Sequence, residues 1–141
     1  MKTNKGFTVI ELLLTLLLMG LFFTIGALKF DFITNYQEKL EVEEVVLMLN
    51  EARNNAISTG YTSKVLLSSK DKTISIRSNN KDFESLKLKH LSMPFEFRTF
   101  TFKSTGAPSV SGSYELRGKK KAYRITVEIA TGKVNLSERK I

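Results

Sequence analysis

The sequence predicts an α+β protein in which a long N-terminal helix, membrane-spanning in its first half, packs on an antiparallel β-sheet. Between Phe7 and Leu28 the only ionisable side chain is Glu11, and these 22 residues would measure about 33 Å as a helix, close to the hydrocarbon core of a bilayer. From residue 32 to residue 57 apolar side chains recur at helical spacing. After residue 64 short apolar runs alternate with polar residues, which is typical of strands.

Three kinds of N-terminal segment begin with cations followed by an apolar run. Lys2 and Lys5 would keep residues 1–6 in the cytoplasm and place the C-terminal domain outside. A secretory signal peptide should end in a small-x-small cleavage site, which residues 24–28 match poorly. A plain signal anchor leaves Glu11 unexplained, because a carboxylate at mid-bilayer costs roughly 2.5 to 3.5 kcal/mol. Something should compensate for this charge, and a prepilin-type leader is the third candidate.

The residues around this carboxylate carry a family resemblance. The run Gly6, Phe7-Thr8, Val9-Ile10, Glu11 resembles the class III leader of type IV prepilins and type II secretion pseudopilins at every position. The resemblance implies that a prepilin peptidase cuts between Gly6 and Phe7 and N-methylates Phe7. It also implies a type IV pilin-like fold with a leader peptide (1–6), a transmembrane and assembly helix (7–28) and an extracytoplasmic pilin-like domain (29–141).

Glu11 would then serve assembly. Cleavage creates an α-ammonium at Phe7, and methylation leaves it cationic. The Glu11 carboxylate of a neighbouring subunit can pair with that ammonium when helices are offset along a filament, so the pair would favour one axial register. The competing interpretation is that Glu11 only extends toward the lipid headgroups.

The helix is expected to continue into the domain outside the membrane and to stop at Gly60. A continuous helix over residues 7–59 would be about 80 Å long. Its second half should present one apolar stripe to the sheet, with charged residues such as Glu38 and Glu41 among the apolar positions. The stripe consists of Phe32, Tyr36, Leu40, Val42, Val45, Val46, Leu49, Ala52, Ala56 and Ile57.

Strand signals fill the rest of the chain. Residues 65–69 and 73–77 flank Lys-Asp-Lys and predict a hairpin. Phe95 and Phe97 have one parity and Phe100 and Phe102 the other, so either a bulge near residue 99 brings them to one face or they belong to two short strands. Residues 104–113 predict a loop. Residues 123–129 alternate as a half-buried strand that turns through residues 130–133 into a final strand at 134–136.

Two stretches narrow the resemblance to a kind of minor pseudopilin. Residues 52–57 (Ala-Arg-Asn-Asn-Ala-Ile), followed by a Gly and a Val-Leu-Leu strand, resemble minor pseudopilins of the GspH and FimT type. Residues 123–140 resemble the C-terminus of competence pseudopilins of the ComGD type. This implies a minor subunit of the competence pseudopilus of Gram-positive bacteria, which brings external DNA across the wall. The alternative is a minor pseudopilin of a type II secretion-like or type IV pilus system, serving protein export or adhesion.

The resemblance also implies partners and a location. The subunit would join major and minor pseudopilins in a hetero-oligomeric filament after processing by the prepilin peptidase. It would be a single-pass protein of the cell membrane, with its C-terminal domain outside, and would reach the cell surface on assembly.

A basic patch suggests a further partner. The chain has 22 Lys and Arg against 14 Asp and Glu, and its densest cationic run comprises Arg117, Lys119, Lys120 and Lys121 with Arg124 close by. Such a patch could contact DNA phosphates without sequence specificity, and Arg139 and Lys140 would extend it. The other interpretations are a solvated hairpin loop or a face directed at acidic wall polymers.

Nothing in the sequence favours an enzyme. It contains no nucleophile elbow, paired catalytic carboxylates, phosphate loop or metal-ligand cluster. The absence of Cys excludes disulfides and thiolate chemistry, and the single His90 has no ligand spacing around it. We therefore expect a structural subunit without catalytic residues, cofactor or metal.

Overall fold

The computed structural model describes residues 8–79 and 81–141 and, within these, all side chains except those of residues 27–31 and 83. The chain divides into two compact units, Met1–Thr34 and Asn35–Ile141, each considered separately below. Helix α1 (Val9–Thr59, 51 residues) contributes to both. It runs through Gly20 and Gly26 without interruption.

In the first unit α1 carries bare apolar side chains. Residues 9–26 form one stretch long and apolar enough to cross a membrane, and none of it is buried within the structure. Its two threonine hydroxyls donate to backbone carbonyls of the same helix, Thr15 to Leu12 O and Thr24 to Gly20 O, each at 2.8 Å. Such internal bonds suit a hydrocarbon environment, where no water can satisfy a hydroxyl.

In the second unit α1 packs one face against the strands, as predicted, but some positions of the predicted apolar stripe are not buried. Val42, Val45, Leu49, Ala52 and Ala56 are buried, and so is Met48, which the prediction omitted. The predicted core positions at 32, 36, 40 and 57 are exposed. Residue 40 lies two positions from both 38 and 42, about 200° around the helix, so it faces away from the strands. The helix ends as expected, because Gly60 has a φ of 74° and its N–H bonds the Ala56 carbonyl at 3.1 Å.

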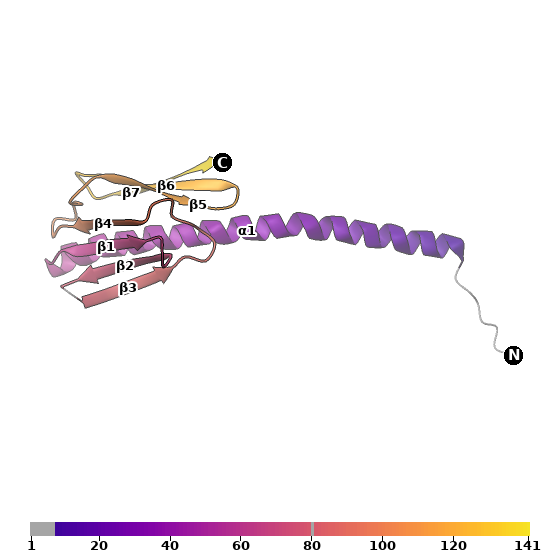
Figure 1. Cartoon of the computed structure of the whole chain (residues 1–141), viewed down its shortest axis with the longest axis horizontal. Helices are drawn as coiled ribbons and strands as arrows, with labels where there is room; N and C mark the ends of the chain where they lie inside the picture. Colours follow the sequence, from indigo (N-terminus) through magenta and orange to yellow (C-terminus); the bar gives the residue numbers. More distant parts are fainter. Residues whose placement is uncertain (1–7, 80) are drawn as a thin grey trace. The chain divides into compact units, whose positions relative to one another are not determined.

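The strands form two antiparallel sheets rather than the single sheet expected (Figure 1). The first has the order β3-β2-β1-β4 and contains β1 (Ser63–Ser68), β2 (Thr73–Ser78), β3 (Lys81–Lys87) and β4 (Phe97–Phe102). The predicted β1–β2 hairpin is confirmed, with Ser68 paired to Thr73. Strand β3 was not predicted.

The phenylalanine pairs fit neither expectation. β4 is one strand paired with β1 in continuous register, so no bulge occurs at residue 99. Phe100 and Phe102 are buried, whereas Phe97 lies on the opposite face and is exposed. Phe95 precedes the strand and packs against the core.

The second sheet has the order β5-β6-β7 and contains β5 (Gly112–Arg117), β6 (Lys121–Val127) and β7 (Val134–Lys140). Strand β5 was not predicted, and its first residues fall in the expected loop. In β6 the buried positions 123, 125 and 127 are confirmed, but Ile129 follows the strand and is exposed. The turn into β7 is confirmed, with the Gly132 N–H bonding the Glu128 carbonyl at 2.8 Å.

One apolar core joins both sheets to α1. At the junction of the sheets the Phe100 and Tyr114 rings stack with centroids 5.0 Å apart. Single bridges between residues 92 and 117 and between 102 and 108 connect segments beyond the strands. The core therefore fixes two small sheets on one helix face.

Candidate functional site

The first candidate region is the start of α1, where a capping box holds Glu11. The Glu11 N–H donates to the Thr8 hydroxyl at 3.4 Å, and the Thr8 N–H donates back to the Glu11 carboxylate at 3.2 Å. The pattern Thr-x-x-Glu before an apolar run is a known helix-start signal that the sequence analysis had missed. Gly6 and Phe7 lie outside the described residues, so cleavage between them and methylation of Phe7 stay predictions.

The second region is the beginning of the folded unit, where α1 carries two buried carboxylates. Glu41 is 7% exposed and accepts the backbone N–H groups of three consecutive residues: Lys89, His90 at 2.9 Å and Leu91 at 3.0 Å. One side chain thus satisfies three backbone donors that would otherwise need partners at this partly buried position. Glu41 therefore pins the segment between β3 and β4 to the helix.

Glu38, one helical turn earlier, holds the β5–β6 turn. It is fully buried, and its Oε1 accepts the Lys119 N–H at 2.9 Å. Gly118 allows this approach, because a Cβ on that residue would lie 2.0 Å from Glu38 Oε2. The Glu38 Oε2 and Tyr123 hydroxyl atoms are buried and have no hydrogen-bond partner among the described residues. Burial raises the pKa of the Tyr123 phenol, and the charge of Glu38 adds to this effect.

A third polar contact fastens the far end of the folded unit. The Arg53 Nε donates to the Thr131 carbonyl of the β6–β7 turn at 3.0 Å. Gly132, with a φ of 66°, packs so closely that a Cβ would lie 2.0 Å from the Gly106 carbonyl oxygen. In the same turn, hydrogen bonds from the Thr131 hydroxyl (2.8 Å) and the Asn135 amide (2.7 Å) lower the pKa of the Glu128 carboxyl.

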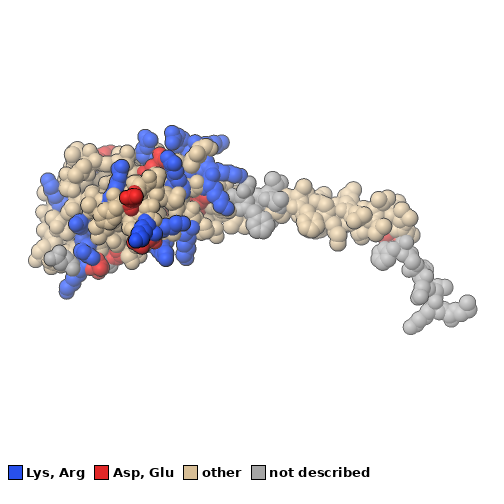
Figure 2. All heavy atoms as spheres, viewed as in Figure 1, with Lys and Arg blue, Asp and Glu red and all other residues tan. Residues whose placement is uncertain are grey.

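The predicted basic patch is divided between two surfaces. Residues 119–121 lie at the β5–β6 turn, next to Glu38. Arg117 and Arg124 lie with Glu115 on the outer face of the second sheet. Arg117 follows Glu115 by two residues on β5, and Arg124 on β6 pairs with Glu115. Lys and Arg side chains stand out on the folded unit in Figure 2.

The outer face is an arginine cluster around a single carboxylate. Arg117 Nε lies 2.7 Å and Arg139 NH2 3.7 Å from Glu115. Glu115, Ala122, Arg124, Ser137 and Arg139 line an open hollow of about 270 Å³. The hydrogen bond from Arg117 lowers the pKa of the Glu115 carboxyl, with further contributions from the Arg139 and Arg124 charges. The cluster offers guanidinium groups to an anion, and Glu115 partly neutralises them.

In the described part of the chain, no group of three or more His, Cys, Asp or Glu side chains could hold a metal ion. His90 contributes its backbone N–H to Glu41, not an imidazole to a site.

Comparison with solved structures identifies the fold. Two crystal forms of the type IV minor pilin FimU of Pseudomonas aeruginosa each match with a TM-score of 0.56 and 17% sequence identity. The match covers 70% of this chain and 91% or 87% of the FimU chains. No protein-family model and no curated protein matches the sequence. The chain therefore has the type IV pilin fold, as expected: a long N-terminal helix followed by antiparallel sheet.

Proposed function

We propose that this chain is a membrane-anchored pilin-like subunit that is cut after Gly6 and assembles into a filament through α1. The observation that carries the proposal is the apolar stretch at residues 9–26, exposed along its whole length on a chain with the type IV pilin fold. So much bare apolar surface requires lipid or other apolar helices around it. A bilayer supplies the first before assembly, and neighbouring subunits supply the second afterwards.

Glu11 supports assembly over simple anchoring. A carboxylate within an apolar helix is costly unless it is paired. Among the described residues, the capping box gives Glu11 a partner at Thr8 but no opposite charge. In the proposal the methylated ammonium of a neighbouring Phe7 provides that charge.

The exposed face of α1 in the folded unit extends the assembly surface. Tyr36, Leu40 and Leu47 are 57%, 47% and 69% exposed, respectively. These apolar side chains lie on the side of the helix turned away from the core, where a soluble monomer would gain from polar residues. Packing of neighbouring helices against this side would bury them.

The finer proposal is that the filament is a competence pseudopilus and this chain a minor subunit of it, acting structurally rather than as an enzyme. The support is the likeness of residues 52–57 to the GspH and FimT type and of residues 123–140 to the ComGD type. A subunit of an export or adhesion filament is the alternative function. In a strain lacking the gene, loss of transformation with normal secretion and adhesion would support competence, and normal transformation would reject it.

Processing is tested by mass spectrometry of the mature chain. We expect an N-terminus at Phe7 carrying one methyl group. A functioning protein that keeps residues 1–6 would refute the proposal.

The role of Glu11 is tested by Glu11→Gln, with Thr8→Val as the matched control that removes the capping hydroxyl but keeps the charge. Glu11→Gln should be processed normally and inserted in the membrane, yet fail to crosslink with partner subunits. Thr8→Val should crosslink. Equal crosslinking by wild type and Glu11→Gln would show that the charge pair is not needed.

Direct contact with DNA is a separate hypothesis, which we place on the arginine cluster. Glu115 neutralises Arg117 and Arg139, so Glu115→Gln should strengthen DNA retention by the full chain in detergent and steepen its salt dependence. Arg124→Gln should weaken retention. Lys103→Gln, an exposed lysine outside the cluster, is the control. Retention that is unchanged by Glu115→Gln and Arg124→Gln would exclude this surface.

A further inference from the structure

Lysines gather at the end of the folded unit where its helix begins. Four main-chain contacts bring separate segments together there. The Lys89 and Lys119 N–H groups bond Glu41 and Glu38, the Leu88 N–H bonds the Lys72 carbonyl at 2.7 Å, and the Ile141 N–H bonds the Lys120 carbonyl at 3.1 Å. Because residues 38 and 41 are one turn apart on the same face of α1, these segments meet at that face.

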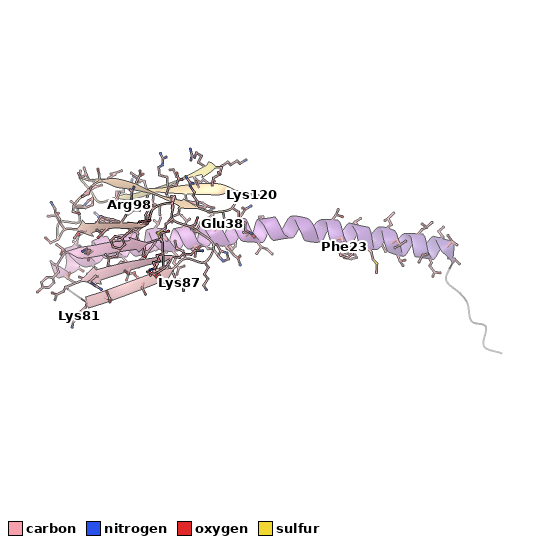
Figure 3. The ribbon with its side chains drawn as sticks, in the orientation of Figure 1. Phe23, Glu38, Lys81, Lys87, Arg98 and Lys120 are labelled. Carbon is pink, nitrogen blue, oxygen red and sulfur yellow. The ribbon has the colours of Figure 1, made fainter. Side chains whose placement is uncertain are left out.

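We call these cations the lysine rim. It consists of Lys70, Lys72, Lys87, Lys89, Lys119, Lys120, Lys121 and Lys140. Figure 3 shows two of them, Lys87 and Lys120, at the same end of the unit as Glu38, with Lys81 at the opposite end. All but the half-buried Lys121 are exposed. The rim therefore draws its lysines from several segments rather than from a single loop.

The rim keeps its positive charge because the nearest glutamates are turned inward. Glu38 and Glu41 are buried and bonded to backbone N–H groups. On the described segments that carry the rim, the exposed carboxylates are Asp71, Glu96 and Glu138, and Glu138 pairs with Lys121 at 3.2 Å. Lysines therefore outnumber exposed carboxylates on these described segments by eight to three.

Chain connectivity relates the rim to the bilayer. Twelve residues join Gly26, the last residue of the apolar stretch, to Glu38. Twelve helical residues measure about 18 Å. The headgroup layer on one side of the hydrocarbon core takes up roughly 5 to 8 Å of this length. A connection of this length allows the rim to approach the headgroups to within about one Debye length, roughly 8 Å at physiological salt, where the lipid charge acts on it.

We propose that the lysine rim binds the anionic lipid headgroups of the membrane in which the subunit is anchored. This proposal depends on the proposed function only for the membrane anchor, and it does not depend on cleavage, competence or filament assembly. Juxtamembrane lysines are attracted to anionic lipid, and the attraction requires no shaped pocket. Lipid suits a row of point charges at one end of the folded unit, whereas the guanidinium cluster around Glu115 has the fork geometry that favours phosphates of a nucleic acid.

The test measures the distance of the folded unit from the lipid surface. The chain contains no Cys, so Ser92→Cys and Ser58→Cys each allow one fluorescent label on the full-length protein. Residue 92 lies beside the rim, bridged to residue 117, and residue 58 lies in the last turn of α1. The protein is reconstituted in phosphatidylcholine vesicles with and without phosphatidylglycerol, and a nitroxide-headgroup lipid quenches the label.

We expect phosphatidylglycerol to increase quenching at residue 92 but not at residue 58, and about 1 M salt to remove the increase. Replacing Lys89, Lys119 and Lys120 with Gln should lower the ratio of lipid-bound to lipid-free folded units on the order of 100-fold, since each lysine contributes roughly fivefold to this ratio. The matched control replaces three exposed distal lysines, Lys64, Lys103 and Lys133, and should leave quenching unchanged.

Three results would overturn the proposal. Quenching at residue 92 could be independent of phosphatidylglycerol, or the distal variant could reduce it as much as the rim variant. The rim variant could instead lose DNA retention while its quenching stays at the wild-type level, which would make the rim a nucleic-acid surface. A failure of leader cleavage would change none of these readouts, so the two proposals fail separately.

Discussion

Replacing Glu41 by Gln should destabilise the folded unit by about 3 kcal/mol, far more than removing an exposed charge from the same helix. Glu41 accepts three consecutive backbone N–H groups through its two carboxylate oxygens. Gln has the same shape but only one acceptor oxygen, and its NH2 group would point at a backbone donor. The segment between β3 and β4 would therefore lose most of its attachment to α1.

The magnitude follows from the burial of each donor. A hydrogen bond to a charged group contributes about 1.5 to 3 kcal/mol, and a buried donor without a partner costs about 1 to 3 kcal/mol. The Leu91 N–H bond is buried, so it should contribute about 2 kcal/mol. The bonds of Lys89 and His90 are only partly buried and water can replace them, so about 1 kcal/mol each is reasonable. Because Oε2 accepts both the His90 and the Leu91 N–H, Gln can keep these two bonds, but as neutral bonds of about half the strength. It loses the Lys89 bond and turns its NH2 group toward that N–H, so the total loss is about 3 kcal/mol.

The assay is thermal unfolding of the full chain in detergent, followed by near-UV circular dichroism. This signal reports tertiary packing of the aromatic rings in the folded unit, whereas far-UV signal would include the anchor helix. A loss of about 3 kcal/mol in a domain of roughly 100 residues lowers Tm by about 10 to 20 °C. Amide exchange at residues 89–91 should accelerate in parallel.

Glu43→Gln is the matched control. Its carboxylate is half exposed, and the nearest cation, Lys39, is 3.9 Å away, so the change should cost less than about 0.5 kcal/mol. If Glu41→Gln unfolds within about 2 °C of the Glu43→Gln protein, or if amides 89–91 keep their protection, the assignment of Glu41 as a structural pin is wrong.

Two further predictions concern single contacts. Gly132→Ala should lower the free energy of unfolding by about 3 kcal/mol, because its positive φ costs about 1 to 2 kcal/mol and its Cβ would meet the Gly106 carbonyl. Gly60→Ala meets open space and should cost only the conformational part. Equal Tm values for the two variants would contradict this. Tyr123→Phe should keep neutral-pH stability within about 1 kcal/mol, because no described residue hydrogen-bonds its hydroxyl. Because the pKa of Tyr123 is raised in the folded state, its contribution to the free energy of unfolding is complete below about pH 10 and is lost as pH rises through the folded pKa. The Phe variant should therefore lose less stability in alkali than the wild type. An identical pH dependence of the two proteins would refute the reasoning.

Elements specified by local pattern were predicted well. The β1–β2 hairpin and the buried positions of β6 follow from strict alternation and turn residues. Strand β5 has the same signal, with Tyr114 and Leu116 buried between polar neighbours, and could have been found. Strand β3 could not, because it is an edge strand rich in charged residues, the composition that protects an edge from pairing with other chains.

The carboxylate pins were beyond prediction for a different reason. Glu38 bonds a residue 81 positions away and Glu41 a residue 48 positions away, and in both cases the donor is a backbone N–H that any residue type provides. No side-chain pattern identifies such a partner. The periodicity of α1 was also ambiguous, because apolar residues occur on the face turned away from the sheets, such as Leu40 and Leu47.

The polar contacts of α1 take on a mechanical meaning under the proposed function. A filament that draws the subunit from the membrane would load the folded unit through its helix, in the direction that shears the helix along the sheets. Apolar contacts resist separation but are not directional, so one helical turn can slide past another. Glu38 and Glu41 at one end and Arg53 at the other bond backbone groups of three separate segments, and these bonds break on any displacement of the helix. The buried charges thus fix the register between helix and sheets, which hydrophobic packing alone leaves weakly specified.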